Sequence, residues 1–363
     1  MTSFPSAAER FAVNGVIIRC ERYGSGHINE TYHVRTDGDD SYILQKINRH
    51  VFQNVRALME NIERITGYLS GRYTDRRRSL HLVHCRDGHK WYVDDAGEYW
   101  RMYEFVEDSQ CYQSAESTEK FYQASVGFAS FLKELEEFPA ATLHETLPGF
   151  HDTPKRYERL RRAVREDACN RRKLVEKEIE FAISREEQAG ELIQKLHEGI
   201  LPLRVTHNDT KLNNVLMDVR TGKALCIVDL DTVMPGLAAY DFGDSIRFGA
   251  STAVEDERDL SRVSLSLELY SVYVRGYAET LGSSLTSAEY ASLPLGAKLM
   301  TLECGVRFLT DYLEGDHYFA VHRPGHNLDR CRTQFQLVAN MEAKWQRMND
   351  IVDEACRRYV LPR

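Results

Sequence analysis

Hydrophobic and polar residues alternate along the first third of the chain, as they do in β-strands with one buried face. The alternation predicts five strands, at Ala12–Arg19, Thr31–Arg35, Tyr42–Ile47, Trp91–Asp94 and Tyr99–Val106. One segment, Val51–Leu69, instead carries an apolar stripe at helical spacing. The region before residue 107 is therefore expected to fold as a small sheet with one helix.

Beyond Glu107 the apolar residues recur mainly at helical spacing. Helices are expected around Phe121–Leu132 and over Arg156–Cys169, Lys173–Leu196, Glu255–Leu281, Thr286–Leu313 and Asp329–Arg358. Only Val205–Asp231 returns to short strands and loops. These patterns predict an α+β protein with a small sheet-rich lobe over residues 1–106 and a larger, mainly helical lobe over residues 107–363.

Composition narrows the class of protein. A chain of 363 residues exceeds what one hydrophobic core usually serves, which supports two lobes. A net charge of −8 argues against nucleic acid or an anionic membrane as the main partner. We expect a cytoplasmic protein, because the N-terminus has no secretory pattern and no apolar run reaches membrane-spanning length. The eight scattered cysteines, without a Cys-x-x-Cys pair, predict reduced thiols.

The strongest chemical signal lies in residues 207–214. Asp209 is followed five residues later by Asn214, and Asp229 comes directly after a short apolar run. This spacing is typical of phosphoryl transfer to a hydroxyl, in which one carboxylate orients the attacking group. We predict Asp209 as the catalytic base, with Asn214 and Asp229 as magnesium ligands. The plainer alternative is that Asp209 only caps a helix beginning at Lys211.

Five neighbouring residues have expected roles. Lys211 should neutralise charge on the transferring phosphoryl group, unless it is simply an exposed lysine at a helix start. Asp231 is either a second metal ligand or a turn residue, and both interpretations stay open. His207 is expected to be a buried structural histidine, because no Ser or Cys nucleophile pattern accompanies it. Asp241 and Asp244 are expected to brace the catalytic loop.

Two glycines between the first strands, Gly24 and Gly26, would let backbone N–H groups approach phosphate oxygens. Such a pair alone is weak evidence, since most are ordinary hairpin turns.

The block Val205–Asp231, followed by Tyr240–Asp244, resembles the aminoglycoside-phosphotransferase-like branch of the protein-kinase-like fold, and within it the N-acetylhexosamine 1-kinases. The resemblance extends over both expected lobes and implies a protein-kinase-like two-lobed architecture. It implies ATP- and Mg²⁺-dependent phosphorylation of the anomeric hydroxyl of N-acetylglucosamine or N-acetylgalactosamine. It also implies sugar contacts from four residues: His27, Thr232, Arg307 and Tyr318.

Each of these four residues also has a plainer explanation. His27 is at a loop tip, and Thr232 can satisfy its own turn. Arg307 can pair with an acidic residue four positions away along one helix face. Tyr318 can be a packed aromatic ring with its hydroxyl at the surface.

The strand around Tyr42–Lys46 departs from the kinase pattern. Gln45 stands where kinases carry the lysine that binds the phosphates. A bulge could turn Lys46 inward instead, and Glu63 would then be its partner. The adenine is expected near the backbone of Glu104 and Val106.

Two rival functions stay open at this point. One keeps the chemistry and changes the acceptor to choline, homoserine, methylthioribose or an aminoglycoside. The other is a catalytically inactive kinase-like binding protein, which the glutamine at position 45 favours and an intact Asp209 opposes.

Overall fold

The computed structural model describes residues 5–24, 28–38 and 40–360. The chain forms two compact units. The first comprises residues 1–110, 141–147 and 216–234. The second comprises residues 111–140, 148–215 and 235–363.

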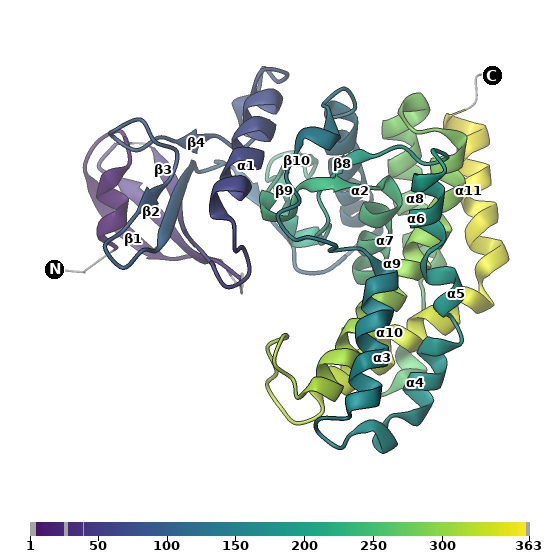
Figure 1. Cartoon of the computed structure of the whole chain (residues 1–363). Helices are drawn as coiled ribbons and strands as arrows, with labels where there is room; N and C mark the ends of the chain where they lie inside the picture. Colours follow the sequence, from purple (N-terminus) through teal and green to yellow (C-terminus); the bar gives the residue numbers. More distant parts are fainter. Residues whose placement is uncertain (1–4, 25–27, 39, 361–363) are drawn as a thin grey trace. The chain divides into compact units, whose positions relative to one another are not determined.

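An antiparallel sheet dominates the first unit (Figure 1). Its strands follow the order β1 (Ile17–Arg22), β2 (Glu30–Thr36), β3 (Ser41–Ile47), β6 (Tyr99–Glu104) and β4 (Leu82–Val83), and β5 (Tyr92–Val93) also pairs with β6. Most buried residues of β3 and β6 are apolar, and Leu44 and Met102, which lie opposite each other in the register, are fully buried. This burial anchors the register of the two strands, because a slip of one residue would expose every inward side chain.

One helix and three short strands complete the first unit. Helix α1 (Val55–Ser70) begins after Asn54, whose side chain accepts a hydrogen bond from the Ala57 N–H. Strand β10 (Ala224–Ile227) pairs with β9 (Val215–Asp218), which pairs with β7 (Ser109–Gln110).

The sequence prediction for this unit is largely confirmed, with three exceptions. The strand expected from Ala12 begins only at Ile17, because Gly15 adopts φ 83° and turns the chain first. The helix expected from Val51 begins at Val55, after its cap. The two-residue strand β4 was not predicted, since so short a segment shows no periodicity.

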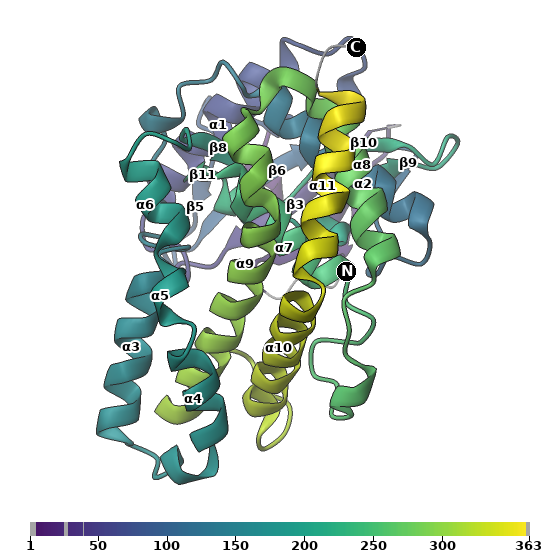
Figure 2. The same cartoon turned by 90° about the vertical axis from the view of Figure 1, so that its right-hand side faces the viewer.

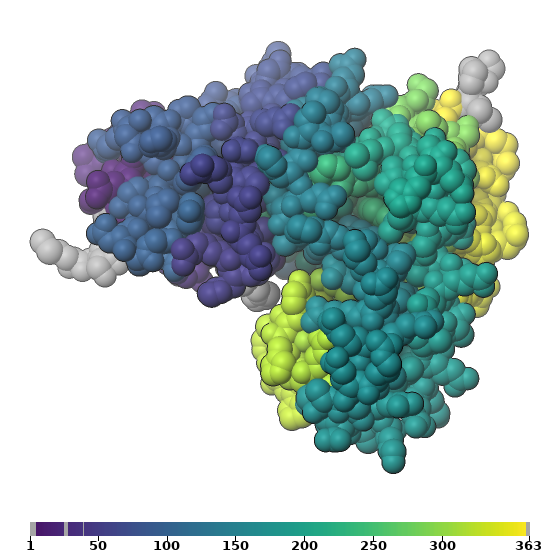
Figure 3. Space-filling view, in the orientation of Figure 1, coloured from purple at the N-terminus to yellow at the C-terminus, as the bar shows by residue number. Residues whose placement is uncertain are grey.

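Helices build most of the second unit (Figure 2). They are α2 (Thr118–Glu134), α3 (Thr153–Glu166), α4 (Glu176–Ile183), α5 (Glu186–Ala189), α6 (Glu191–His197), α7 (Ala238–Gly249), α8 (Leu267–Leu281), α9 (Ser287–Glu314), α10 (His326–Ala343) and α11 (Trp345–Tyr359). Helix α9 lies at the centre and packs against α3, α7, α10 and α11. The teal segment of α3 to α6 covers an extended part of this unit's surface (Figure 3).

The α+β fold class is confirmed, and the predicted helices around Phe121–Leu132 and at Thr286–Leu313 form. Two long predicted helices are broken: Lys173–Leu196 forms α4 to α6, and Asp329–Arg358 forms α10 and α11. The prediction for Glu255–Leu281 is wrong over its first half, since α8 begins at Leu267. There, short polar side chains bind the backbone instead; Asp259, for example, accepts from the Ser261 N–H.

Among the described residues, no helix combines the length and the apolar character needed to cross a bilayer. All eight cysteines are free thiols, as the sequence predicted.

Helices α7 and α9 approach each other closely because glycines face each other at their crossing. A Cβ atom added to Gly243 would lie 2.3 Å from the carbonyl oxygen of Gly296. A Cβ added to Gly296 would lie 2.2 Å from the carbonyl oxygen of Ala239. Both contacts are with backbone, which cannot rotate away. The glycines therefore fix the position of α7 against α9.

We expect Gly296→Ala to destabilise the protein by about 1–3 kcal/mol, because the two backbones must separate. Its Tm in differential scanning calorimetry should fall by several degrees. Gly67→Ala is the matched control, since Gly67 is an exposed helical glycine with no atom within 4 Å of its added Cβ. The control should melt at or slightly above the wild-type temperature. A Gly296→Ala protein with wild-type Tm would show that the close crossing is not required.

Candidate active site

Two carboxylates from α7 hold the loop that follows strand β8 (Arg204–Thr206). Asp241 accepts hydrogen bonds from the backbone N–H groups of His207, at 2.8 Å, and Asn208, at 2.7 Å. Asp244 accepts from the N–H of Thr210 at 3.0 Å. The expected bracing role of Asp241 and Asp244 is thus confirmed. The loop backbone is held in place over four consecutive residues.

The imidazole of His207 is fully buried. It lies against the rings of Phe128 and Phe131 of α2, with centroid separations of 5.5 and 6.0 Å. Its Nδ1 accepts a hydrogen bond from the backbone N–H of Asp209 at 3.3 Å. These contacts fit the structural role expected for this histidine, which shapes the turn that presents Asp209.

Asp209, Lys211 and Asn214 meet in the second unit. The Asn214 amide nitrogen donates to the backbone oxygen of Asp209, at 2.8 Å, and to its Oδ2, at 3.2 Å. Lys211 Nζ lies 2.8 Å from Asp209 Oδ1. The alternative in which Asp209 caps a helix is wrong: Leu212–Asn214 is a single 3₁₀ turn with no side-chain cap. Because the amide nitrogen of Asn214 donates to Asp209, its amide oxygen points away from that residue.

Burial and nearby charges change the pKa values of three groups around this loop. Burial raises the pKa of Asp241 to about 6, although the N–H groups of the loop act to lower it. Burial would also raise the pKa of Asp244, but the charges of Arg247 and Lys211 bring it below its usual value. Burial would lower the pKa of Lys211, and the carboxylates of Asp209 and Asp244 raise it instead.

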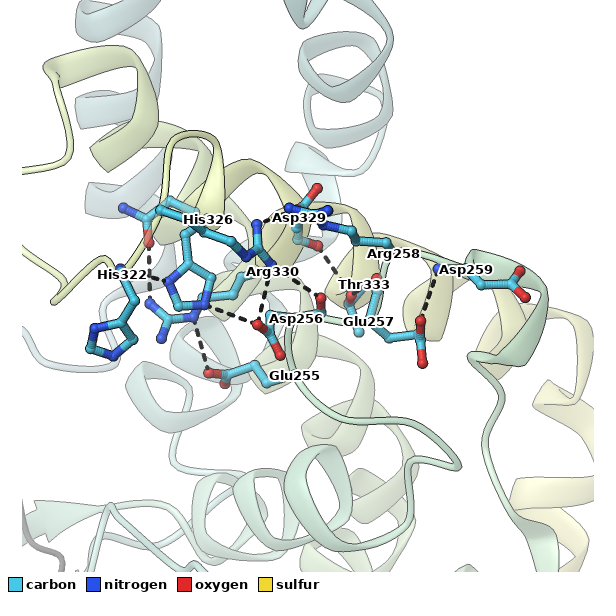
Figure 4. A network of polar contacts seen from close by, with 12 residues as sticks. Glu255, Asp256, Glu257, Arg258, Asp259, His322, His326, Asp329, Arg330 and Thr333 are labelled. Carbon is cyan, nitrogen blue, oxygen red and sulfur yellow. Dashed lines mark hydrogen bonds and ion pairs between the residues drawn. The ribbon is translucent and has the colours of Figure 1, made fainter.

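Arg247 extends the bracing toward the loop between α7 and α8. Its guanidinium binds Asp244 at 2.9 Å and Glu255 at 3.0 Å. The next residue, Asp256, accepts from His326 Nε2 at 3.1 Å, at the start of α10 (Figure 4). A continuous series of polar contacts therefore runs from Thr210 to α10.

In the first unit, Asp229 follows strand β10 and adopts the left-handed conformation, with φ 61° and ψ 56°. A 3₁₀ turn, Leu230–Thr232, follows and contains Asp231. Asp231 is buried, and its carboxylate accepts from the Asn29 amide at 2.6 Å and lies 2.5 Å from Arg101 Nη1. Both carboxylate oxygens of Asp231 therefore contact protein groups. Asp231 thus acts as a residue that stabilises its own turn.

The inward-turned Lys46 and its pairing with Glu63 are contradicted. Strand β3 runs against β2 and β6 without a bulge. Lys46 forms an ion pair with Glu30, which raises the pKa of the lysine, and Glu63 pairs with Lys90. The side chain of Gln45 lies on the opposite face of β3 from that of Lys46.

Gln45 belongs to a partly buried cluster of hydrogen-bonded polar side chains that the sequence did not predict. Its amide donates to Thr31 Oγ1 at 3.1 Å, and its Oε1 accepts from Arg101 Nε at 2.9 Å. Arg101 lies directly opposite Gln45 in the register of β3 and β6. The one available signal was a charged residue at an inward position of a predicted strand.

The remaining predicted nucleotide contacts, and the predicted sugar contacts His27 and Thr232, belong to the first unit. Gly24 has φ 74° and open space around its Cα, whereas Gly26 and His27 lie outside the described residues. The Glu104 N–H donates to the His81 carbonyl oxygen, and its carboxylate pairs with Arg76. The Val106 carbonyl oxygen accepts from Ser109 at 2.6 Å. Thr232 is buried in its 3₁₀ turn.

Arg307 and Tyr318 line one pocket in the second unit, together with Arg156, Arg159, Thr310, Asp311 and Phe319. The Arg307 guanidinium lies 5.3 to 5.8 Å from the ring centres of Phe150, Tyr318 and Phe319. Its Nη2 is 3.5 Å from the Tyr318 hydroxyl.

The alternative in which Arg307 pairs along its own helix is wrong. Asp311 accepts from the backbone N–H groups of residues 317–319, and Glu303 binds His151 and Thr153. Arg307 forms no ion pair among the described residues and lines the pocket. Burial would raise the pKa of Glu303, but the charges of His151 and Arg307 lower it, so the Arg307 charge also acts on Glu303.

The protein therefore contains an antiparallel sheet and a loop that carboxylates brace, and such parts are found in enzymes of phosphoryl transfer. Residues 19–270 match the model of the phosphotransferase enzyme family, and the chain belongs to that family.

Solved structures share the fold at low sequence identity. A microcompartment-associated aminopropanol kinase is 18% identical, with a TM-score of 0.58 over 94% of this chain and 97% of its own. An amicoumacin kinase in complex with AMP-PNP and Ca²⁺ is 14% identical, with a TM-score of 0.58 over 96% and 91%. An aminoglycoside phosphotransferase from Alicyclobacillus acidocaldarius is 12% identical, with a TM-score of 0.61 over 98% of each chain.

The raised pKa of Asp241 predicts a pH-dependent contribution to stability. Below about pH 4 this carboxyl is protonated in both the folded and the unfolded protein. As pH rises through about 6, the folded protein has to ionise a buried group, so stability is lost. We expect the wild type to lose roughly 3 kcal/mol relative to Asp241→Asn between pH 4 and pH 7. Urea unfolding at four pH values measures this; a difference that stays constant or grows with pH would contradict the assignment.

Proposed function

We propose that the protein transfers the γ-phosphate of ATP to the anomeric hydroxyl of an N-acetylhexosamine, in a magnesium-dependent reaction. The observation that carries the proposal is the arrangement of Asp209, whose carboxylate is held by the Lys211 ammonium and the Asn214 amide. The family membership supports phosphoryl transfer. The choice of an N-acetylhexosamine follows the sequence resemblance, and the charge of the pocket at Arg307 supports a neutral acceptor.

Asp209 has the chemistry of a base for a hydroxyl. Its carboxylate would accept a hydrogen bond from the acceptor, aim a lone pair of the acceptor oxygen at the γ-phosphate and take the proton late in the reaction. Lys211 would offset the negative charge of the transferring group, because its ammonium already lies 2.8 Å from the same carboxylate. Its raised pKa keeps the lysine charged at neutral pH.

Asn214 and Asp229 suit magnesium, which prefers oxygen ligands and needs only one or two from protein when it is bound to nucleotide phosphates. Over the described part of the chain, no three His, Cys, Asp or Glu side chains gather as a self-contained metal site. Bound magnesium would neutralise phosphate charge during transfer. The amicoumacin kinase, which was solved with AMP-PNP and Ca²⁺, supports a nucleotide accompanied by a divalent cation.

The pocket at Arg307 favours a neutral acceptor over a cationic one. Three arginines line it, and its carboxylate, Asp311, is engaged by backbone N–H groups. Guanidinium groups repel an ammonium ion and donate hydrogen bonds to hydroxyl and carbonyl oxygens. A sugar with an acetamido group offers both kinds of oxygen. Choline and the aminoglycosides carry positive charge and are therefore disfavoured.

A neutral acceptor other than a hexosamine, such as methylthioribose, is the second candidate. The charge of the same pocket supports it equally. The inactive binding protein is less well supported, because Asp209, Lys211 and Asn214 already contact one another as a working site requires.

Asp209→Asn should lower turnover by at least roughly 100-fold, because the amide cannot accept the acceptor's proton. Nucleotide binding, measured by calorimetry with ADP, should stay near the wild-type value. Asp353→Asn, an exposed carboxylate on α11, controls for the loss of one charge. Wild-type turnover in Asp209→Asn would remove this residue from its assigned role.

On a panel of acceptors, we expect turnover with N-acetylglucosamine or N-acetylgalactosamine, and ³¹P NMR should locate the phosphate on carbon 1. Arg307→Met keeps most of the apolar stem and removes the donors. It should raise the KM for the sugar about 10-fold or more, with the KM for ATP unchanged, since a charged hydrogen bond contributes about 1.5–3 kcal/mol. Turnover on choline with none on hexosamines would overturn the choice of acceptor.

A further inference from the structure

Arg101 is a buried cation in the middle of the nucleotide sheet. Its side chain is only 1% exposed, on a strand that is otherwise apolar on this face. Its guanidinium contacts three groups: Gln45 through Nε, Asp231 through Nη1, and the ring of Tyr103, whose centre is 5.3 Å away. Fully buried arginines are rare, because removing the charge from water is costly.

The partner of Arg101 belongs to the turn that carries Asp229. Asp231 is two residues beyond Asp229, and its Oδ2 accepts from Asn29. The backbone oxygen of Asp231 accepts from the Thr146 hydroxyl at 3.2 Å. Two residues further, the Val233 carbonyl accepts from Asn61 of α1 at 3.2 Å. Residues 229–233 are thus fastened at several points, and Arg101 provides the attachment to the sheet.

Stability alone is a weak reason to keep this ion pair. Replacing a buried ion pair with apolar side chains is often neutral or stabilising. Arg101 Nη1 and Asp231 Oδ1 are 2.5 Å apart, yet both atoms are buried without a properly aligned hydrogen bond. The contact therefore acts mainly through charge. Burial would lower the pKa of Arg101, but the carboxylates of Asp231 and Asp229 raise it, so the charge of Arg101 also acts on Asp229.

Arg101 lies opposite the position at which kinases carry a phosphate-binding lysine and this chain carries Gln45. Gln45 occupies the place at which kinases carry a phosphate-binding lysine. In the register of the sheet, Arg101 is directly opposite Gln45, so the side chains of the two positions share one face. Lys46 lies next to Gln45 and is engaged by Glu30. Among the described residues of β3 and β6, Arg101 is the cationic side chain on this face.

We propose that Arg101 is a positioning residue, which holds the segment Asp229–Asp231 in its metal-binding conformation and supplies from β6 the fixed charge that Gln45 lacks. Asp229 needs such support, because a non-glycine residue at φ 61° is held there only by its surroundings. A positive charge beside two carboxylates also reduces their mutual repulsion. The inference rests on the proposed role of Asp229 as a magnesium ligand.

A pair of variants separates positioning from stability. Arg101→Met leaves Asp231 buried without its counter-charge, so its Tm should fall markedly. Adding Asp231→Asn removes that lone charge, and the double variant should recover most of the lost Tm. Mn²⁺ affinity in the presence of ADP, measured by electron paramagnetic resonance, should nevertheless stay at least about 10-fold weaker than in the wild type.

The kinetic signature should match the binding result. The double variant should show a lower kcat and a higher requirement for Mg²⁺, with the KM for the acceptor unchanged. If recovery of Tm also restores Mn²⁺ affinity and kcat, Arg101 is only a structural ion-pair partner and the inference is overturned. Arg19→Met, which removes an exposed guanidinium of the same sheet, should leave both quantities unchanged.

A lysine placed at position 45 gives an independent test. In the Arg101→Met background, Gln45→Lys returns a cation to the same face from the neighbouring strand. We expect this rescue to recover at least about 10-fold of the lost Mn²⁺ affinity, and no recovery in a folded protein would count against the inference. In the wild-type background, the same substitution sets two cations opposite each other and should lower Tm.

The failure of this inference can be told apart from the failure of the proposed function. Asp229→Asn serves as the reference, because it alters the metal ligand itself. If this variant binds Mn²⁺ and ADP like the wild type, the assignment of Asp229 is wrong. If it loses Mn²⁺ while Arg101→Met with Asp231→Asn does not, only the role of Arg101 is wrong.

Discussion

The hydrogen bonds that Asp241 accepts from the backbone N–H groups of His207 and Asn208 are the contacts on which the proposed catalytic loop depends. A loop between a strand and a 3₁₀ turn has no ladder of its own, so its N–H groups need partners from elsewhere. One turn of α7 provides them, and the glycine crossing with α9 fixes where that turn lies. The geometry of Asp209 therefore originates in helix packing, through a carboxylate that burial makes unusually basic.

Sequence patterns predicted the elements whose burial is periodic. Strands β3 and β6 and helix α9 formed nearly where alternation or helical spacing placed them, because most of the buried positions in each are apolar. The helix expected over Glu255–Leu281 was half wrong, since residues 255–266 bind their backbone with side chains. Such competition depends on local geometry that a charge or hydrophobicity pattern does not encode.

The grouping of Asp209, Lys211 and Asn214, which we propose as catalytic, could be predicted because the three residues are neighbours along the chain. The role of Arg101 could not, since its meaning depends on which residue lies across the sheet and on a turn 130 residues further along. A single charge within an apolar strand indicated that something unusual occurs there. Only the pairing of β3 with β6 connects that charge with the glutamine at position 45.

The proposed exchange of an amine for a guanidinium in the sheet of the first unit has a practical consequence for chemical labelling. Nucleotide analogues that acylate a kinase lysine rely on a nucleophilic ε-amino group beside the phosphates. On this face, position 45 offers an amide and position 101 a guanidinium that stays protonated, and neither attacks an acyl carbon. Acylating probes and inhibitors aimed at this strand would therefore not react at positions 45 and 101, which leaves Lys211 as the lysine proposed to lie near the phosphates.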